Sequence, residues 1–524
     1  MALGDTALDD GSLSGSHNTA VGHAALTANT SGASNTGIGR EALATATTGS
    51  DNTAVGKLAL YANTTASNNT AVGSDALVSN TTGASNVGVG TQALGANTTG
   101  AGNTAVGYQA LDANTTANNN TAVGRTALGA NTTGTSNVAM GQAALVANTT
   151  ASNNVAIGRD AMFVNTTGHS NVAVGYQSLY SNTTGTSNVA VGYLAADANT
   201  EGYAITAIGE NALGANTTGY DNTACGREAL KANTTANNNT AVGEAALKVN
   251  TTASDNTALG AGSQASTTTG DNNVSAGTNS MSSNTTGANN VAVGRSAMSA
   301  NTTASGNTAV GRSALQNNTA GGNTAVGFEA LQENTTGFAN VGVGLNAGHN
   351  ITTGNQNTLV GGSFSNYVGG SLTTGAANTL VGTDCGKSIT TSDENTAVGS
   401  GALTNCTTGA NNIVIGRNAG TDAVLDITTE SNRLVLGNNN ITNAYVKTTI
   451  AVTSDQRDKT DIVDIGSDRG LSFVEKLRPV SFYYNENRDK PDVKTGFKRY
   501  GFLAQEVLAL EGSDNVIINN EDTN

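Results

Sequence analysis

The sequence predicts an all-β chain, a β-solenoid or β-roll of 17-residue repeats, followed by a small α+β module. Three observations support this: an NTAVG-like motif recurs with a constant 17-residue spacing, small and larger residues alternate within it, and the charge content changes near Ser454. Charged side chains are roughly four times as frequent from Ser454 onward as before it. We therefore expect a shaft over residues 1–439, a β connector over 440–453 and a C-terminal module over 454–524.

The repeat unit reads N-T-A-V-G-x-x-A-L-x-x-N-T-T-G-x-x, numbered below as positions 1 to 17. The 17-residue spacing runs from Asn18, with one Asn replaced by Ile205. It shortens to 16 at Asn323 and lengthens to 21 at Asn378, and a last, looser copy begins at Asn432. Such a regular period indicates a repeat architecture.

Positions 2 to 4 predict a short strand, because position 2 is Thr or Val, position 4 is usually Val, Ile, Leu or Met, and position 3 is small. The small position 3 suggests that another backbone approaches closely. The larger residue at position 4, on the apolar face of this strand, is the first expected anchor, and Leu or Met at position 9 predicts a second buried anchor. The Gly at position 5 and the small residue at position 15 predict corners with positive φ.

A single unit cannot fold alone. Its two apolar anchors supply roughly 3–5 kcal/mol of transfer free energy, which cannot offset the entropy of ordering the unit. The units must therefore stack, with equivalent residues forming ladders. About 24 steps of ~4.8 Å would make a rod of roughly 115 Å.

Composition excludes several function classes. The net charge of −15 is spread thinly, which argues against nucleic acid or an anionic membrane as partner. No apolar stretch is long enough for membrane insertion, and the N-terminus lacks a signal peptide, so we expect no secretory export if this start is native. Cys225, Cys385 and Cys406 show no paired spacing and are interpreted as small core residues.

No cofactor or metal site is expected. The four His residues share no ligand spacing, and no nucleotide, flavin or phosphate motif occurs. The NTT triplets match the glycosylation sequon, but their placement at one corner of nearly every unit favours an Asn turn with a Thr ladder. An ice-binding Thr face is disfavoured because Asn corners interrupt the Thr rows.

The repeats from about residue 15 to 440 resemble the left-handed β-roll heads of trimeric autotransporter adhesins and the shafts of phage tail fibres. This is a match of pattern, with a unit longer than the adhesin heads usually show. The resemblance implies a homotrimer in which the small position 3 faces the neighbouring chains.

Beyond the repeats, the pattern predicts four elements. NITNAYVKTTIAV (440–452) alternates like a pair of strands, and GLSFVEKLRP suggests a short helix ended by Pro479. VSFYY predicts a strand, and YGFLAQEVLAL a strand or turn leading into a helix. Together they predict an α+β module with its own small core.

This module resembles the intramolecular chaperone domain at the C-terminus of phage tailspikes, endosialidases and tail fibres, a self-cleaving serine peptidase family. The resemblance lies in SDQRDKTDI from Ser454, Gly470 and Leu471, LRPVSF (477–482) and YGFLAQEV (500–507). Since Asn524 follows so soon after Ser454, we expect the module to be incomplete.

The resemblance implies a single-turnover self-cleavage. The bond between Thr453 and Ser454 would be cut, with Ser454 as nucleophile and Lys459 as general base. That Lys must be neutral near pH 7, so its pKa must be lowered by desolvation or a nearby cation. Arg457 could be that cation or a simple surface charge. A chaperone that no longer cuts is the alternative.

The leading hypothesis is therefore a structural protein of a virion or extracellular fibre: a trimeric tail-fibre shaft for host attachment, whose chaperone sets the register of the trimer. Its partners would be itself, other fibre or baseplate proteins, and a host surface glycan. The alternative is a trimeric autotransporter adhesin, disfavoured because neither a signal peptide nor a membrane anchor is seen. A glycan-degrading enzyme is disfavoured by the lack of paired carboxylates in a pocket-forming insert. Phe364 and Tyr367, in the largest insertion, are the candidate receptor-binding residues.

Overall fold

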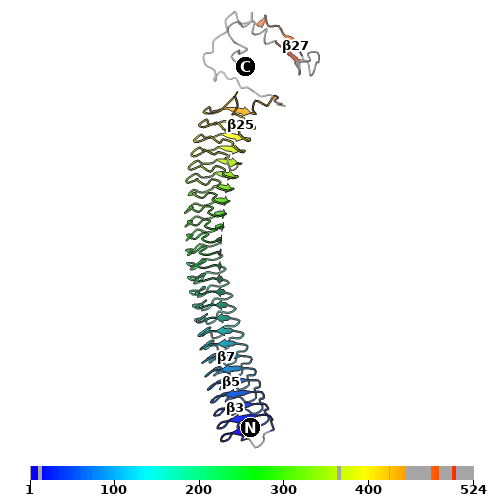
Figure 1. The fold of residues 1–524 in the computed structure, drawn as a ribbon, viewed down its shortest axis with the longest axis vertical. Helices are drawn as coiled ribbons and strands as arrows, with labels where there is room; N and C mark the ends of the chain where they lie inside the picture. The colour runs from blue at the N-terminus through cyan, green and yellow to red at the C-terminus, as the bar shows by residue number, and fades with distance from the viewer. Residues whose placement is uncertain are drawn as a thin grey trace. The chain divides into compact units, whose positions relative to one another are not determined.

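The computed structural model describes residues 2–9, 14–362, 367–423, 425–443, 445, 474–482 and 499–502. The chain divides into two compact units, Met1–Thr442 and Asn443–Asn524. The first unit is a long, gently curved stack of coils (Figure 1). The predicted all-β solenoid with its 17-residue turns is thereby confirmed.

Each coil contributes one short strand, which pairs in parallel with the strand of the next coil, so that 26 strands form a single sheet. Equivalent positions of the repeat lie side by side, for example Ala105 beside Ala122 and Val106 beside Val123. The strands are β1 (Ala2–Leu3), β2 (Thr19–Val21), β3 (Thr36–Ile38), β4 (Thr53–Val55), β5 (Thr70–Val72), β6 (Val87–Val89), β7 (Thr104–Val106), β8 (Thr121–Val123), β9 (Val138–Met140), β10 (Val155–Ile157), β11 (Val172–Val174), β12 (Val189–Val191), β13 (Thr206–Ile208), β14 (Thr223–Cys225), β15 (Thr240–Val242), β16 (Thr257–Leu259), β17 (Val274–Ala276), β18 (Val291–Val293), β19 (Thr308–Val310), β20 (Thr324–Val326), β21 (Val341–Val343), β22 (Thr358–Val360), β23 (Thr379–Val381), β24 (Thr396–Val398), β25 (Ile413–Ile415) and β26 (Leu434–Leu436).

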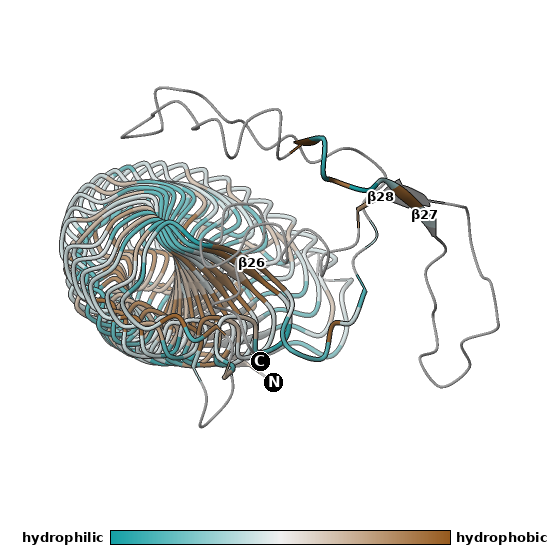
Figure 2. Ribbon diagram, turned by 90° about the horizontal axis from the view of Figure 1, so that it is seen from above, coloured by the Kyte–Doolittle hydropathy of each residue, from teal (hydrophilic) through white to brown (hydrophobic). Residues whose placement is uncertain are grey.

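The interior of the coil is lined by small residues and one larger side chain per turn. Position 3, usually Ala, is fully buried, and so are the Ala and Leu of positions 8 and 9, such as Ala110 and Leu111. Figure 2, seen from above the first unit, shows the coils superimposed, with the hydrophobic strands fanned out on one side. The Leu at position 9 is thus a buried anchor, as predicted.

Two ladders of buried Asn side chains run along the stack. At position 1, the backbone N–H of Asn103 donates to Oδ1 of Asn86 at 2.9 Å. At position 12, Nδ2 of Asn97 donates to Oδ1 of Asn80 at 2.7 Å and to the carbonyl of Gly100 at 3.0 Å. The amides therefore satisfy each other and the turns of the backbone inside an otherwise apolar interior.

The corners of the coil differ in part from the prediction. Position 5 has positive φ, as expected; φ of Gly107 is 136°. Position 15 does not, and the expectation for it is wrong. It is small, Gly or Ala in most coils, because its side chain points at the carbonyl of position 15 in the next coil, as a Cβ on Gly100 would at that of Ala117. Instead, ordinary residues at positions 7, 9 and 17 adopt φ between 50° and 60° in this part of the stack, among them Gln109, Leu111 and Asn119.

The two ends of the stack correct the positions expected for the first and last copies of the repeat. β1 pairs Ala2 with Ala20, so a further coil precedes the first predicted one. Its sequence, ALGDTAL, fits positions 3 to 9 of the repeat and could have been found. At the other end the backbone of Arg433, not Asn432, donates to Oδ1 of Asn412. The last copy therefore begins one residue later than predicted.

In the second unit, β27 (Val480–Phe482) pairs antiparallel with β28 (Arg499–Gly501). The strand predicted in VSFYY is thus present over its first three residues. The predicted helix before Pro479 is reduced, in its described part, to a single turn in which the backbone of Leu477 donates to Val474. The described residues of the predicted connector, 440–443 and 445, form no strand.

Candidate functional site

The broadest candidate surface is the outer side of the sheet, here called the strand face: the side chains at positions 2 and 4 of β2 to β26. In every one of these strands the middle residue is buried and the two flanking residues are partly or fully exposed. None of the flanking residues is charged. Exposure reaches 42% at Met140 and 67% at Leu436. The face is a continuous stripe of Thr and aliphatic side chains along the whole stack.

This geometry overturns the expected role of position 3. The small residue does not face neighbouring chains, because it points into the coil and is fully buried. The backbone that approaches it is the chain's own: a Cβ on Gly37 would lie 3.2 Å from the carbonyl of Ala42 and 3.3 Å from Leu26. Position 4, expected to be a buried anchor, lies on the outside instead. Any association through the sheet would therefore use positions 2 and 4.

The cysteines are likewise divided between the interior of the coil and the strand face. All three are free thiols; Cys385 and Cys406 are buried, as predicted, whereas Cys225 occupies position 4 and is partly exposed on the strand face. The expectation that Cys225 is a core residue is wrong. Burial raises the pKa of Cys385 to about 12, so this thiol is inert near neutral pH. Within the described part of the chain, no group of three or more His, Cys, Asp or Glu side chains could hold a metal.

The NTT triplets are built into the stack rather than displayed. Asn97 is fully buried, and the hydroxyl of Thr98 donates to the carbonyl of Thr115 in the next coil at 3.0 Å. A buried Asn in a hydrogen-bonded corner is not available to a glycosyltransferase in the folded chain. The geometry therefore agrees with the ladder interpretation.

Several aromatic side chains stack on their counterparts one coil away. The rings of Tyr176 and Tyr193 lie 5.4 Å apart with an interplanar angle of 13°, and those of Tyr203 and Tyr220 lie 4.9 Å apart at 2°. The guanidinium of Arg159 lies 5.7 Å from the Tyr176 ring. Because the ring faces cover each other, these columns stabilise coil stacking more than they offer platforms for a sugar.

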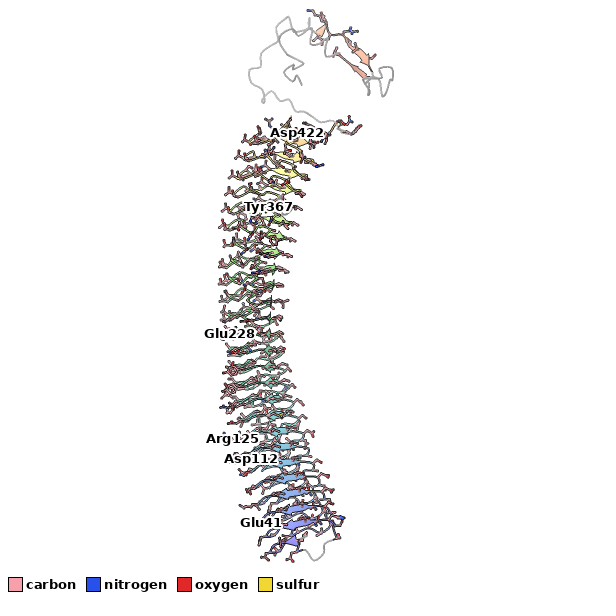
Figure 3. The ribbon with its side chains drawn as sticks, viewed as in Figure 1. Glu41, Asp112, Arg125, Glu228, Tyr367 and Asp422 are labelled. Atoms are coloured by element: carbon pink, nitrogen blue, oxygen red, sulfur yellow. The ribbon has the colours of Figure 1, made fainter. Side chains whose placement is uncertain are left out.

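Charged residues are distributed along the stack rather than gathered at one site, as the labelled Glu41, Asp112, Arg125 and Glu228 show (Figure 3). A surface hollow of about 280 Å³ is lined by Gln109, Asp112, Thr126, Gly129, Ala130 and Val146. Burial raises the pKa of Asp112. This hollow holds one carboxyl group, whereas glycoside hydrolysis uses two.

The predicted receptor-binding pair is only half described. Phe364 lies outside the described residues. Tyr367 is half-buried, and its ring centroid lies 6.3 Å from that of His349, tilted by 43°. The Tyr367 ring therefore contacts its own coil stack, and a role in receptor binding stays a prediction.

The predicted self-cleavage residues Thr453, Ser454 and Lys459 lie outside the described residues. What the structure does show is that β27 and β28 bring together two of the segments that carry the resemblance. Val480 of LRPVSF lies opposite Gly501 of YGFLAQEV. Segments far apart in the sequence are thus neighbours in one small sheet.

Among the described residues, no helix is long and apolar enough to cross a bilayer. Comparison of the chain with curated proteins finds no match. Comparison with protein families finds one described as Chaperone of endosialidase (Peptidase_S74), matched by residues 454–516. The chain thus joins a long β-solenoid to a C-terminal segment of the endosialidase chaperone type.

Proposed function

We propose that this chain is the shaft of a trimeric fibre, belonging to a phage or phage-like particle, that serves attachment to a host surface. The proposal rests on one observation: a solenoid with an uncharged strand face along its whole length is joined to a segment that matches the endosialidase chaperones. The contacts with a baseplate, other fibre proteins or a host glycan are further predictions of this proposal.

In the proposed trimer, three copies place their strand faces together around a common axis. Thr, Val, Ile and Leu side chains have no charge to desolvate, so burying them against another copy is favourable. The interior of each coil is already closed by its own Ala, Leu and Asn side chains. The trimer thus forms by lateral packing of complete solenoids and not by exchange of strands.

Such an assembly must also fix its register, that is, which coil of one chain lies beside which coil of the next chain. Since successive coils are nearly equivalent, a shift by one coil loses little contact, and the strand face by itself specifies register weakly. A C-terminal domain that associates first aligns the three chains and lets the coils pack from that end. Its removal afterwards leaves a rod that persists because unfolding is slow.

The proposed self-cleavage proceeds through an ester. Oγ of Ser454 attacks the carbonyl carbon of Thr453 while neutral Lys459 takes the hydroxyl proton. The C–N bond then breaks, the amine of Ser454 takes a proton, and water hydrolyses the ester. The products are a shaft ending at Thr453 and a fragment of residues 454–524.

Ser454→Ala in the full chain tests the cleavage. The wild type is expected to give two bands on a denaturing gel, separated at Thr453, and the variant one band of full length. Lys459→Met is the companion variant, since it removes the base but keeps the nucleophile. Identical band patterns for all three proteins would contradict the cleavage.

The mass of the native assembly tests the trimer independently. Light scattering on the full chain with Ser454→Ala is expected to give three times the chain mass of 52.0 kDa. Val106→Lys and Val123→Lys together place two charges on the strand face and are expected to weaken association, whereas Thr99→Lys with Thr116→Lys, at exposed corners, is the matched control. A monomeric mass for the Ser454→Ala chain with its strand face unchanged would refute the proposed assembly.

A further inference from the structure

One layer inside the solenoid breaks the apolar pattern. The buried hydrophobic residues form two separate clusters, one ending at Ala258 and the other beginning at Met281. Between them, the core positions are occupied by polar side chains, all fully buried: Ser263, Gln264, Thr267, Ser275 and Ser280. These five residues, here called the polar layer, replace the Ala, Leu and Asn that the same positions usually carry.

The polar layer is only partly satisfied by its own hydrogen bonds. Nε2 of Gln264 donates to the Thr257 carbonyl at 3.0 Å and to Oγ of Ser275 at 2.9 Å. Oγ of Ser263 contacts Oγ of both Ser275 and Ser280. However, Oε1 of Gln264 has no partner, although the side chain is fully buried. A buried network with an unpaired member costs stability relative to an apolar core.

The Asn ladder at position 12 is interrupted in the same coil. Thr267 occupies position 12, where an Asn would continue the Asn ladder of that position. As a result, Oδ1 of Asn250 in the preceding coil is buried without a partner, and so is Oγ1 of Thr267. In the following coil, Nδ2 of Asn284 donates to the Gly287 carbonyl and not to position 12 of the preceding coil, while its Oδ1 still accepts from Nδ2 of Asn301. The apolar core and one Asn ladder therefore both stop at this coil.

The backbone, in contrast, is continuous across the layer. β16 pairs with β17 in the usual register, with Leu259 beside Ala276. The backbone N–H of Gln264 donates to the Ser280 carbonyl at 3.0 Å, the same length as the equivalent bond from Leu230 to Ala246. The layer thus weakens side-chain coupling between coils while it leaves the stack intact.

We propose that the polar layer divides the solenoid into two cooperative units, one on each side of residues 259–280, and is the place where the stack opens first. In a repeat protein, stability is a sum of terms for each repeat and for each contact between neighbours. A weak contact between two strong blocks lets each block unfold without the other. Local opening then concentrates at the weak contact. The proposal concerns the interior of one chain and does not depend on the proposed trimer.

Amide hydrogen exchange on the full chain measures this directly. The amides of Leu230, Gln264 and Met298 all occupy position 9 and make hydrogen bonds of 3.0 Å to the next coil. We expect the Gln264 amide to exchange at least about tenfold faster than the other two, because opening is local. Heating is expected to show two unfolding transitions.

The decisive variant restores the usual residues: Ser263→Ala, Gln264→Leu, Thr267→Asn, Ser275→Ala and Ser280→Ala together. Exchange at position 264 should slow to the rate of Leu230, and the two transitions should merge into one. The reverse variant moves the layer into an ordinary coil: Ala93→Ser, Leu94→Gln, Asn97→Thr, Ala105→Ser and Ala110→Ser. It should create a new fast-exchanging amide at residue 94.

Two results would overturn the proposal. One is equal exchange at Leu230, Gln264 and Met298 in the wild type. The other is a restored variant that keeps two transitions, since the division would then arise elsewhere in the chain. If the reverse variant does not fold, the restored variant still decides, because it replaces each residue by one that ordinary coils accommodate.

Discussion

At the scale of single residues, the Asn ladder at position 12 shows how the hydrogen bonds of one coil depend on the next coil. In the described part of the solenoid, four ladder oxygens are buried without a partner: Oδ1 of Asn29, Asn250, Asn301 and Asn334. In three cases position 12 of the following coil is not Asn but Ala46, Thr267 or Ile351, and in the fourth the following coil is the shortened one. A substitution at position 12 therefore affects the amide of the preceding coil, a consequence of the stacking of equivalent positions.

Opposite changes at two ladder positions test this dependence. Asn97→Ala removes both its own bonds and the one that Asn114 donates to it. We expect a loss of about 2–4 kcal/mol in the free energy of unfolding, since buried partners are left unpaired. Ala46→Asn restores a partner to Asn29 and should stabilise by about 1 kcal/mol. Urea unfolding measures both; stabilisation by Ala46→Leu as well would show that packing, and not the amide, is responsible.

The two ion pairs of Glu228 predict an acid-dependent contribution to stability. Oε1 of Glu228 lies 2.8 Å from the amine of Lys231 and Oε2 lies 2.7 Å from that of Lys248. These bonds lower the pKa of Glu228 from 4.5 to about 2. Because the folded pKa is depressed, the contribution is present above pH 4.5 and is lost as the pH falls toward 2.

Melting temperatures of wild type and Glu228→Gln as a function of pH check this expectation. The variant should melt lower at pH 7, and the difference should disappear near pH 2. Asp112→Asn is the contrasting variant: burial raises the pKa of Asp112, so its charge opposes folding at pH 7 and the substitution should not destabilise. A Glu228→Gln difference that is constant with pH would exclude the charge as its cause.

At the scale of the coil, the C-terminal end of the solenoid fills its core in a different way. Most coils combine Ala at position 3 with Leu at position 9, whereas two of the later coils carry Leu359 and Leu380 at position 3. Position 9 of the coil before each is then Gly348 or Gly369. A Cβ on Gly348 would lie 2.9 Å from Cδ2 of Leu331, 3.0 Å from Cδ1 of Ile351 and 3.4 Å from Cδ1 of Leu359. A large side chain at position 3 thus accompanies a glycine at position 9. The side-chain volume inside the coil moves from one position to the other while the backbone path stays the same.

A double-mutant cycle tests the exchange. Leu359→Ala alone should cost about 2–5 kcal/mol in the free energy of unfolding, because it leaves a cavity. Gly348→Leu alone should also destabilise, because the new side chain meets Leu331, Ile351 and Leu359. Together they recreate the usual pairing, so the double variant should lose less than the sum by about 1–3 kcal/mol. Additive losses would show that residues 348 and 359 are not energetically coupled.

At the scale of the whole molecule, the strand face predicts where copies of the chain meet. Cys225 is the one cysteine on this face, whereas Cys385 and Cys406 are buried. In a threefold assembly with the strands in register, the three copies of Cys225 lie close to the axis and to each other. A shift by one or more coils would separate them along the axis.

A short bis-maleimide reagent uses this thiol as a reporter of register. We expect linked pairs of chains from the native full chain carrying Ser454→Ala, and none after Cys225→Val. Moving the thiol one coil along, with Cys225→Val and Val242→Cys, should restore the linkage. A trimer that gives no linked product with either thiol would contradict strand-face packing, whereas a monomer would contradict the trimer itself.

Much of this architecture follows from the sequence by itself. The period of the repeat determined the stacking, the alternation at positions 2 to 4 placed the strands, and the change in charge content and motifs marked the C-terminal segment. The sequence did not decide which side of the strand is interior. Ala and Val are both apolar, and alternation alone does not distinguish a small inner residue from a small residue at an interface. Only the closed coil decided it, because the space opposite Leu26 or Leu77 admits no side chain much larger than Ala, so the larger residues at positions 2 and 4 must point outward.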